Sequence, residues 1–155
     1  MNHVSRSLFF VLLLVTIGSA QAQRSSIERL PELHTRFRNY HQDFLDFAQS
    51  GLTAGSEFDS ARELARSADE TTVFLGSAET LVDIYYAVSS KEDRDRIRPM
   101  IQRDLAFYRK RLDFSIKETN LELSYMKRPG VVAEATRMRD DLREAKNIFD
   151  SIELR

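Results

Sequence analysis

The stretch from Ile97 to Lys127 constrains the fold most, because as a helix it would carry apolar residues on two of its faces. One set steps along the chain by threes and fours, the spacing that keeps side chains on one helix face. Its members are Ile101, Leu105, Tyr108, Leu112, Ile116, Thr119, Leu123 and Met126. A second set recurs every seven residues and consists of Met100, Phe107, Phe114 and Leu121. At about 100° per residue the two sets lie roughly opposite each other, so such a helix needs neighbours on both sides.

Three other segments show helical spacing on one face each. They span about residues 30–50, 57–89 and 131–153. Their apolar seams are Leu30, Leu33, Phe37, Tyr40, Phe44 and Phe47; Ala61, Leu64, Ala68, Thr71, Leu75, Ala78, Val82 and Tyr85; and Val131, Ala135, Met138, Leu142, Ala145, Phe149 and Ile152. Short connections between four helices favour antiparallel neighbours. The sequence therefore predicts an all-α, up-down-up-down four-helix bundle, with a long central hairpin formed by the second and third helices.

The polar and special residues between these segments predict where helices begin and end. Ser56 and Ser90, each followed three residues later by an aspartate, are typical of helix N-caps. Pro99 allows two alternatives: it kinks a helix that begins at Lys91, or the main helix begins near Arg98. Gly76 is a candidate break in the second helix. Gly51 suits the position after the first helix, and residues 128–130 are predicted to form a connector.

Residues 1–22 are predicted to be a cleaved signal peptide. Arg6 is followed by an apolar segment from Leu8 to Ile17 and then by small residues that end in Ala20-Gln21-Ala22, an A-x-A cleavage pattern. The apolar segment is about half the ~20 residues that a membrane-spanning helix needs. We therefore expect a periplasmic or secreted protein of one domain, residues 23–155, without a stable membrane anchor.

Composition excludes several classes of function. The chain has no cysteine, which rules out disulfides and thiolate metal sites. Its 23 basic and 24 acidic side chains are nearly balanced, which argues against broad electrostatic binding to nucleic acid.

Few residues suggest a catalytic, metal-binding or ligand-binding site. His34 and His41 are seven residues apart, about 10 Å along a helix, so one metal ion cannot use both. Glu79 and Arg103 are candidates for a buried polar pair or the wall of a polar pocket. No nucleophile–base pair, pair of acids or phosphate loop is recognisable, so we expect no catalytic site, no cofactor and no metal.

The second and third predicted helices share a further set of apolar residues. If the chain reverses after Ser90, residues equally far from that turn lie level with each other. Phe74 would then lie level with Phe107, and Leu81 with Met100.

Two interpretations of this set remain open. In the first, it joins the two helices inside one bundle. In the second, it stays partly exposed and binds a protein partner or a second copy of the chain. The residues concerned are Phe74, Leu81, Met100, Phe107, Phe114 and Leu121, with Tyr125 at one end and Arg103, Lys110 and Glu118 as a polar rim.

The function that the sequence favours is a non-enzymatic protein-interaction module, such as an adaptor, chaperone, inhibitor or immunity-type binder. The alternative is a ligand- or metal-binding bundle with a small internal polar pocket formed by Glu79 and the histidines.

Overall fold

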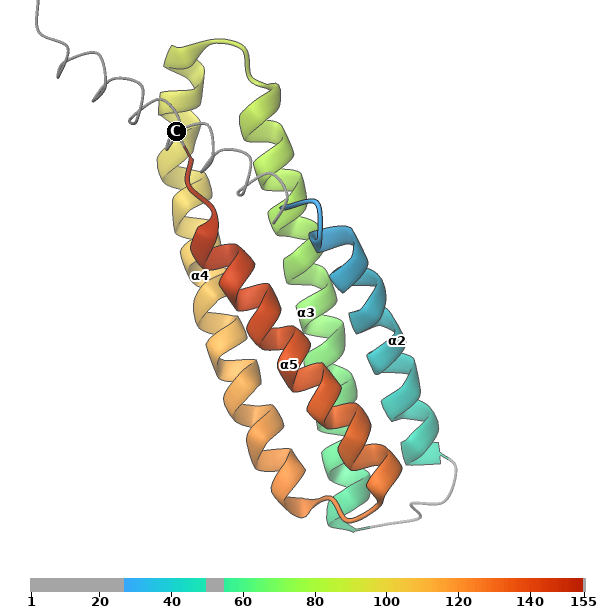
Figure 1. The fold of residues 1–155 in the computed structure, drawn as a ribbon. Coiled ribbons are helices and arrows are strands. Elements are labelled where there is room, and N and C mark those ends of the chain that lie inside the picture. Colours follow the sequence, from blue (N-terminus) through green and yellow to red (C-terminus); the bar gives the residue numbers. More distant parts are fainter. Residues whose placement is uncertain (1–26, 50–54, 155) are drawn as a thin grey trace, which may run out of the picture.

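The computed structural model describes residues 27–49 and 55–154, which form helices and contain no strand. The helices are α2 (Leu30–Gln49), α3 (Ser56–Ala87), α4 (Lys91–Tyr125) and α5 (Pro129–Ser151). They pack into a helical bundle, as the apolar spacing predicted (Figure 1). The predicted signal peptide and Gly51 lie outside the described residues.

The two longest helices, α3 and α4, form a hairpin whose turn extends past the ends of α2 and α5 (Figure 1). Arg66 of α3 pairs with Glu118 of α4 at 3.2 Å, whereas the Arg98 guanidinium of α4 donates to the Tyr85 hydroxyl of α3 at 3.0 Å. Residue numbers therefore rise along α3 as they fall along α4, so the two helices are antiparallel. Helix α2 packs along α3, and α5 packs along both α4 and α2.

The core lies between the predicted seams. Every seam residue of α3 and α5 is buried. On α4, Ile101, Leu105 and Leu112 are at most 2% exposed. One residue of α2 differs from the prediction: Phe47 is half-buried, and the next residue, Ala48, takes the buried position at 5% exposure.

The predicted cap at Ser90 is confirmed, and of the two alternatives at Pro99 the start at Lys91 is the one formed; the candidate break at Gly76, the cap at Ser56 and the connector over residues 128–130 are corrected. Helix α4 begins at Lys91 and continues through Pro99, and the Asp93 amide donates to Ser90 Oγ at 3.4 Å as an N-cap. Helix α3 is unbroken across Gly76. The predicted Ser56 cap is wrong, because Ser56 is already helical and Gly55 precedes it without a side-chain cap. Residues 129–130 belong to the first turn of α5, where proline needs no amide hydrogen.

Four small polar side chains of α3 and α4 are buried in the core. Ser67, Thr71, Ser115 and Thr119 are at most 2% exposed. Each threonine hydroxyl donates to the carbonyl four residues earlier, at 2.8 Å. The hydroxyls of Ser67 and Ser115 are buried without a hydrogen-bond partner among the described residues. Small side chains at these positions allow the two helices to approach closely.

Candidate functional site

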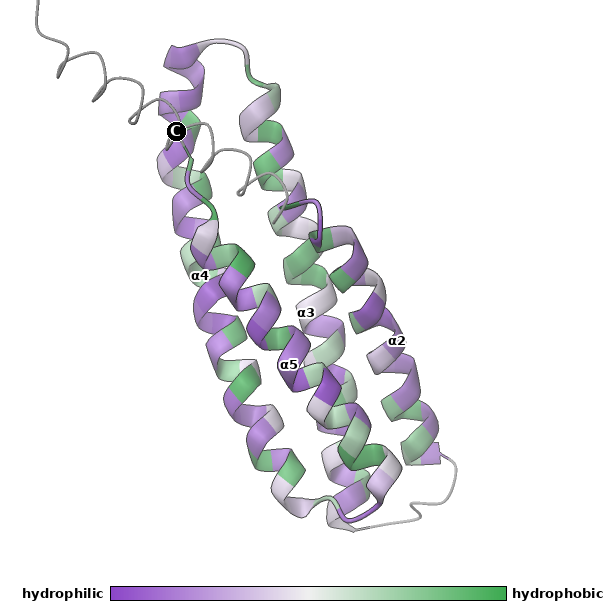
Figure 2. Ribbon diagram, in the orientation of Figure 1, coloured by the Kyte–Doolittle hydropathy of each residue, from purple (hydrophilic) through white to green (hydrophobic). Residues whose placement is uncertain are grey.

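Four large apolar side chains of α4 remain half exposed on the outside of the bundle. We call Met100, Phe107, Phe114 and Leu121 the outer stripe; their exposed fractions are 48%, 54%, 46% and 53%. Tyr125 extends it at 47%. Because each helical residue rises about 1.5 Å, the outer stripe is roughly 32 Å long. Figure 2 shows hydrophobic residues recurring along α4 among strongly hydrophilic ones.

The two predicted partners on α3 turn inward. The Phe74 ring meets Phe107 edge-to-face at 6.3 Å and stacks on Tyr108 at 5.5 Å. The contact confirms the predicted level of Phe74 and Phe107 in the hairpin. Leu81 is partly buried and packs against the core. The two interpretations of the sequence thus divide between the helices: the α3 residues join the hairpin, whereas the α4 residues stay exposed.

Arg111 fixes the aromatic side chains of this surface. Its guanidinium lies 5.9 Å from the Phe74 ring and 5.3 Å from the Phe114 ring. It also forms an ion pair with Glu70 of α3. An arginine held between ring faces and a carboxylate has few alternative rotamers. The rings beside it are therefore held in place from the α3 side.

A network of charges forms the edge of the outer stripe nearest α3. Arg66 pairs with Glu63 at 2.8 Å, with Glu70 at 2.6 Å and with Glu118 at 3.2 Å. Burial raises the pKa of Glu118, and the Arg66 guanidinium acts against that rise. Two ion pairs, Arg66 with Glu118 and Glu70 with Arg111, thus link α3 to α4 along this edge.

The opposite edge of the outer stripe carries exposed basic side chains. Arg103, Lys110 and Lys117 are exposed and follow the same seven-residue repeat. The Arg103 side chain is 76% exposed and bonds to its neighbour Asp104 at 3.1 Å. The prediction of Arg103 as a buried polar group is therefore wrong, because its side chain projects outward beside the outer stripe.

Glu79 is half-buried. It follows buried Ala78 by one residue, a rotation of about 100°, which takes it from the seam of α3 to the boundary of the core. The suggested pair with Arg103 is not formed, since Arg103 bonds to Asp104 instead.

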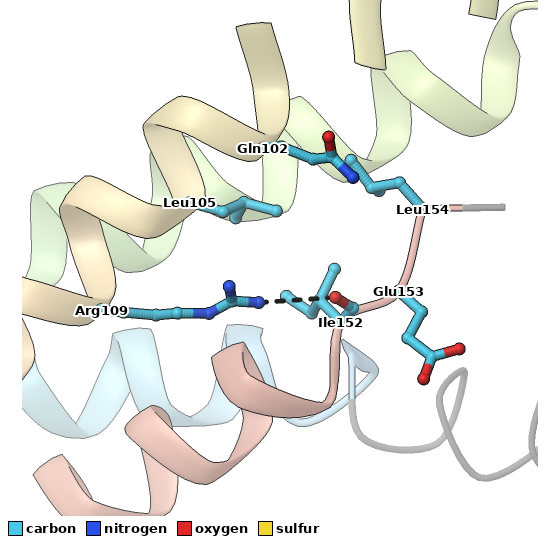
Figure 3. Close-up of a pocket in the computed structure, with 6 residues that line it drawn as sticks. All are labelled: Gln102, Leu105, Arg109, Ile152, Glu153 and Leu154. Atoms are coloured by element: carbon cyan, nitrogen blue, oxygen red, sulfur yellow. Dashed lines mark hydrogen bonds between the residues drawn. The ribbon is translucent and has the colours of Figure 1, made fainter. Parts of the chain in front are cut away.

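A cavity of about 330 Å³ lies between α4 and the segment after α5 (Figure 3). Its lining residues are Gln102, Leu105, Arg109, Ile152, Glu153 and Leu154. The Arg109 guanidinium donates to the carbonyl oxygen of Phe149 at 2.6 Å and to that of Ile152 at 3.5 Å. These carbonyls lie at the C-terminal end of α5, where the Phe149 carbonyl also accepts from the Ile152 amide at 3.3 Å. Arg109 thus caps α5, and we assign it a structural role.

The two histidines line a groove between α2 and α3, together with Arg38, Asp69 and Thr72. His41 Nδ1 donates to the Ala65 carbonyl oxygen at 3.0 Å, which occupies one ring nitrogen. Within residues 27–49 and 55–154, no group of three or more His, Asp or Glu side chains is placed to hold a metal ion.

A buried polar contact between α2 and α5 was not predicted from the sequence. Asp141 is 9% exposed and accepts hydrogen bonds from the Tyr40 hydroxyl at 2.8 Å and from Arg36 at 3.0 Å. Burial, and next the bond to Asp141, raise the pKa of Tyr40 above its ordinary value. Nothing local in the sequence marks this contact, because its partners are about a hundred residues apart.

Compared with known proteins, the chain matches no protein-family model, no curated protein and no solved structure. Among the described helices, none combines the length and the apolar character that crossing a membrane requires.

Proposed function

We propose that this chain is an exported, non-enzymatic protein-interaction module, an up-down-up-down bundle that binds another protein through the outer stripe. The observation that carries the proposal is the half exposure of four large apolar side chains at one spacing along α4. The largest exposed apolar patch of a folded protein, roughly 300–600 Å², is often functional, and larger patches mark interaction sites. The proposed role is that of an adaptor, chaperone, inhibitor or immunity-type binder.

The size of the surface indicates what a partner must supply. A large apolar side chain covers about 200 Å², so four half-exposed ones leave about 400 Å² to be buried. At about 25 cal/mol per Å², burial would contribute about 10 kcal/mol, similar to the cost of association. Polar contacts along both edges of the outer stripe must therefore contribute to a stable complex.

The outer stripe can be occupied without disturbing the bundle. Its residues are rigid members of a long helix, and Arg111 and Phe74 support two of them from the inner side. Export follows from the predicted signal peptide, residues 1–22, and would place this surface in the periplasm or outside the cell.

Affinity capture tests the proposal. Immobilised protein with Phe107→Ser and Phe114→Ser is compared with wild type in extract of the cells that produce it. We expect a bound protein, or further copies of the chain, on wild type and at least tenfold less on the variant. The matched control is Ile84→Ser with Tyr86→Ser, two side chains 48% and 52% exposed outside the outer stripe. Equal binding to both variants, or none to wild type, would overturn the proposal.

A further inference from the structure

The two edges of the outer stripe differ in net charge: one is basic, and the other carries three carboxylates beside two arginines. This inference rests on the proposed function, since it concerns the partner of the same surface. We propose that the partner is a second copy of this chain, with the two α4 helices parallel and in register about a two-fold axis.

The first edge is basic. Arg103, Lys110 and Lys117 follow the residues of the outer stripe by three positions, so they form a row along its outward side. Lys110 and Lys117 are exposed, and Arg103 is 76% exposed, so all three basic groups can meet a partner.

The second edge, which faces α3, carries an acidic group near each of the same heights. Within the chain Asp104 pairs with Arg103, Glu118 pairs with Arg66, and Glu70 pairs with both Arg66 and Arg111, so a cation of the second copy would join or replace these pairs. Asp104 and Glu118 follow the outer stripe by four positions. Between them on α4 lies Arg111, whose ion pair brings Glu70 of α3 to the intermediate height. The side chains of Asp104, Glu70 and Glu118 are 33%, 30% and 26% exposed. Their spacing matches that of the three basic groups.

The direction of the second copy decides which edges meet. When two parallel helices pack along one stripe, opposite edges face each other across the interface, as in parallel coiled coils. Arg103, Lys110 and Lys117 of one copy then face Asp104, Glu70 and Glu118 of the other, and the two-fold axis repeats the three contacts. When the helices are antiparallel, each edge faces its own kind, and basic groups would meet basic groups. Charge therefore selects the parallel arrangement.

The same arrangement brings identical apolar residues together. Each residue of the outer stripe faces its own copy near the axis, and two copies of the outer stripe bury about 800 Å² together. The charged edges would have to add about 400 Å² for the interface to reach the range of about 1,200–2,000 Å² that specific complexes bury.

Because the chain has no cysteine, single cysteines can test this arrangement without further changes. The full coding sequence is expressed with Leu121→Cys, with Met100→Cys or with the control Ile84→Cys, and each product is oxidised mildly. We expect disulfide-linked dimers from each single stripe variant, because facing Cα atoms near the axis lie within the ~4.4–6.8 Å that a disulfide spans. The control should give at least tenfold less, and light scattering should show wild type as a dimer.

Other outcomes separate the inference from the proposed function. Cross-linking only in a mixture of Met100→Cys and Leu121→Cys protein would mean antiparallel copies and would overturn the inference. A monomeric wild type that still captures a different protein in the extract experiment would overturn it too, while leaving the proposed function intact. A monomer that captures nothing would overturn both.

Discussion

Two sides of α4 share one helix and similar apolar spacing but differ in what covers them. On the inner side, Ile101, Leu105 and Leu112 are at most 2% exposed, because α3 and α5 pack on them. On the outer side, the outer stripe remains about half exposed. Apolar periodicity therefore predicts that a helix face needs contact, but it does not say whether the same chain provides that contact.

The largest expected effect tests this difference directly. Leu112→Ala should lower the free energy of unfolding by about 2–5 kcal/mol, because it removes fully buried groups and leaves a cavity. Phe114→Ala, which removes a larger but half-exposed side chain, should lower the free energy of unfolding by less, about 1 kcal/mol. Chemical denaturation at low protein concentration, with far-UV circular dichroism, measures both.

Low concentration matters in that comparison, since association of copies would stabilise the folded state. Equal losses for Leu112→Ala and Phe114→Ala in the monomer would mean that the outer stripe belongs to the core, and the distinction between the two sides would fail.

Much of the inner side could be predicted from sequence, because helical spacing reports which side chains share a face. The seams of α3 and α5 were predicted in full, and Phe74 was correctly placed level with Phe107. Spacing could not predict Asp141, whose buried contact with Tyr40 depends on how α2 and α5 meet in space. Spacing also suggested that Glu79 is buried, whereas its side chain is half-buried, one position from the seam. Whether the outer stripe binds a partner stays a prediction.

Removing the buried charge between α2 and α5 should lower stability more than removing a charge on the surface. Asp141→Ala should destabilise the fold by about 1–3 kcal/mol, because the buried Tyr40 hydroxyl loses its acceptor and Arg36 loses its ion pair. Asp95→Ala, which breaks the surface pairs with Lys91 at 2.6 Å and with Arg98 at 2.9 Å, should change stability little. Thermal melts of both variants measure this difference in stability. An unchanged Tm for Asp141→Ala would contradict the prediction.

The same contact predicts a response to alkali. Since the pKa of Tyr40 is raised in the fold, the unfolded chain loses this proton first, from about pH 10.0 upward. The contribution of the raised pKa of Tyr40 to stability is therefore complete below pH 10.0 and declines as pH rises further. Tyr40→Phe should show a shallower loss of stability than wild type between pH 9 and 11 in urea titrations. Identical slopes would mean that Tyr40 does not contribute.

The smallest expected effect concerns the buried small polar side chains of α3 and α4. Ser115→Ala should raise the free energy of unfolding by about 1 kcal/mol, because it removes a buried hydroxyl without a partner and favours the helix. The control is Ser124→Ala, whose exposed hydroxyl donates to the Leu121 carbonyl at 2.6 Å. A loss of stability in Ser115→Ala, by urea denaturation, would show that this hydroxyl has a partner in solution.

The position of Arg111 affects how much side-chain conformational entropy is lost when a partner binds. Since its guanidinium sits against the Phe74 and Phe114 rings and is anchored by Glu70, those rings need little rearrangement when another surface arrives. Little side-chain freedom is then lost on docking, so more of the contact energy remains as affinity. A lysine there would keep the charge but not the flat stacking surface, and the encounter would begin from a looser set of conformations.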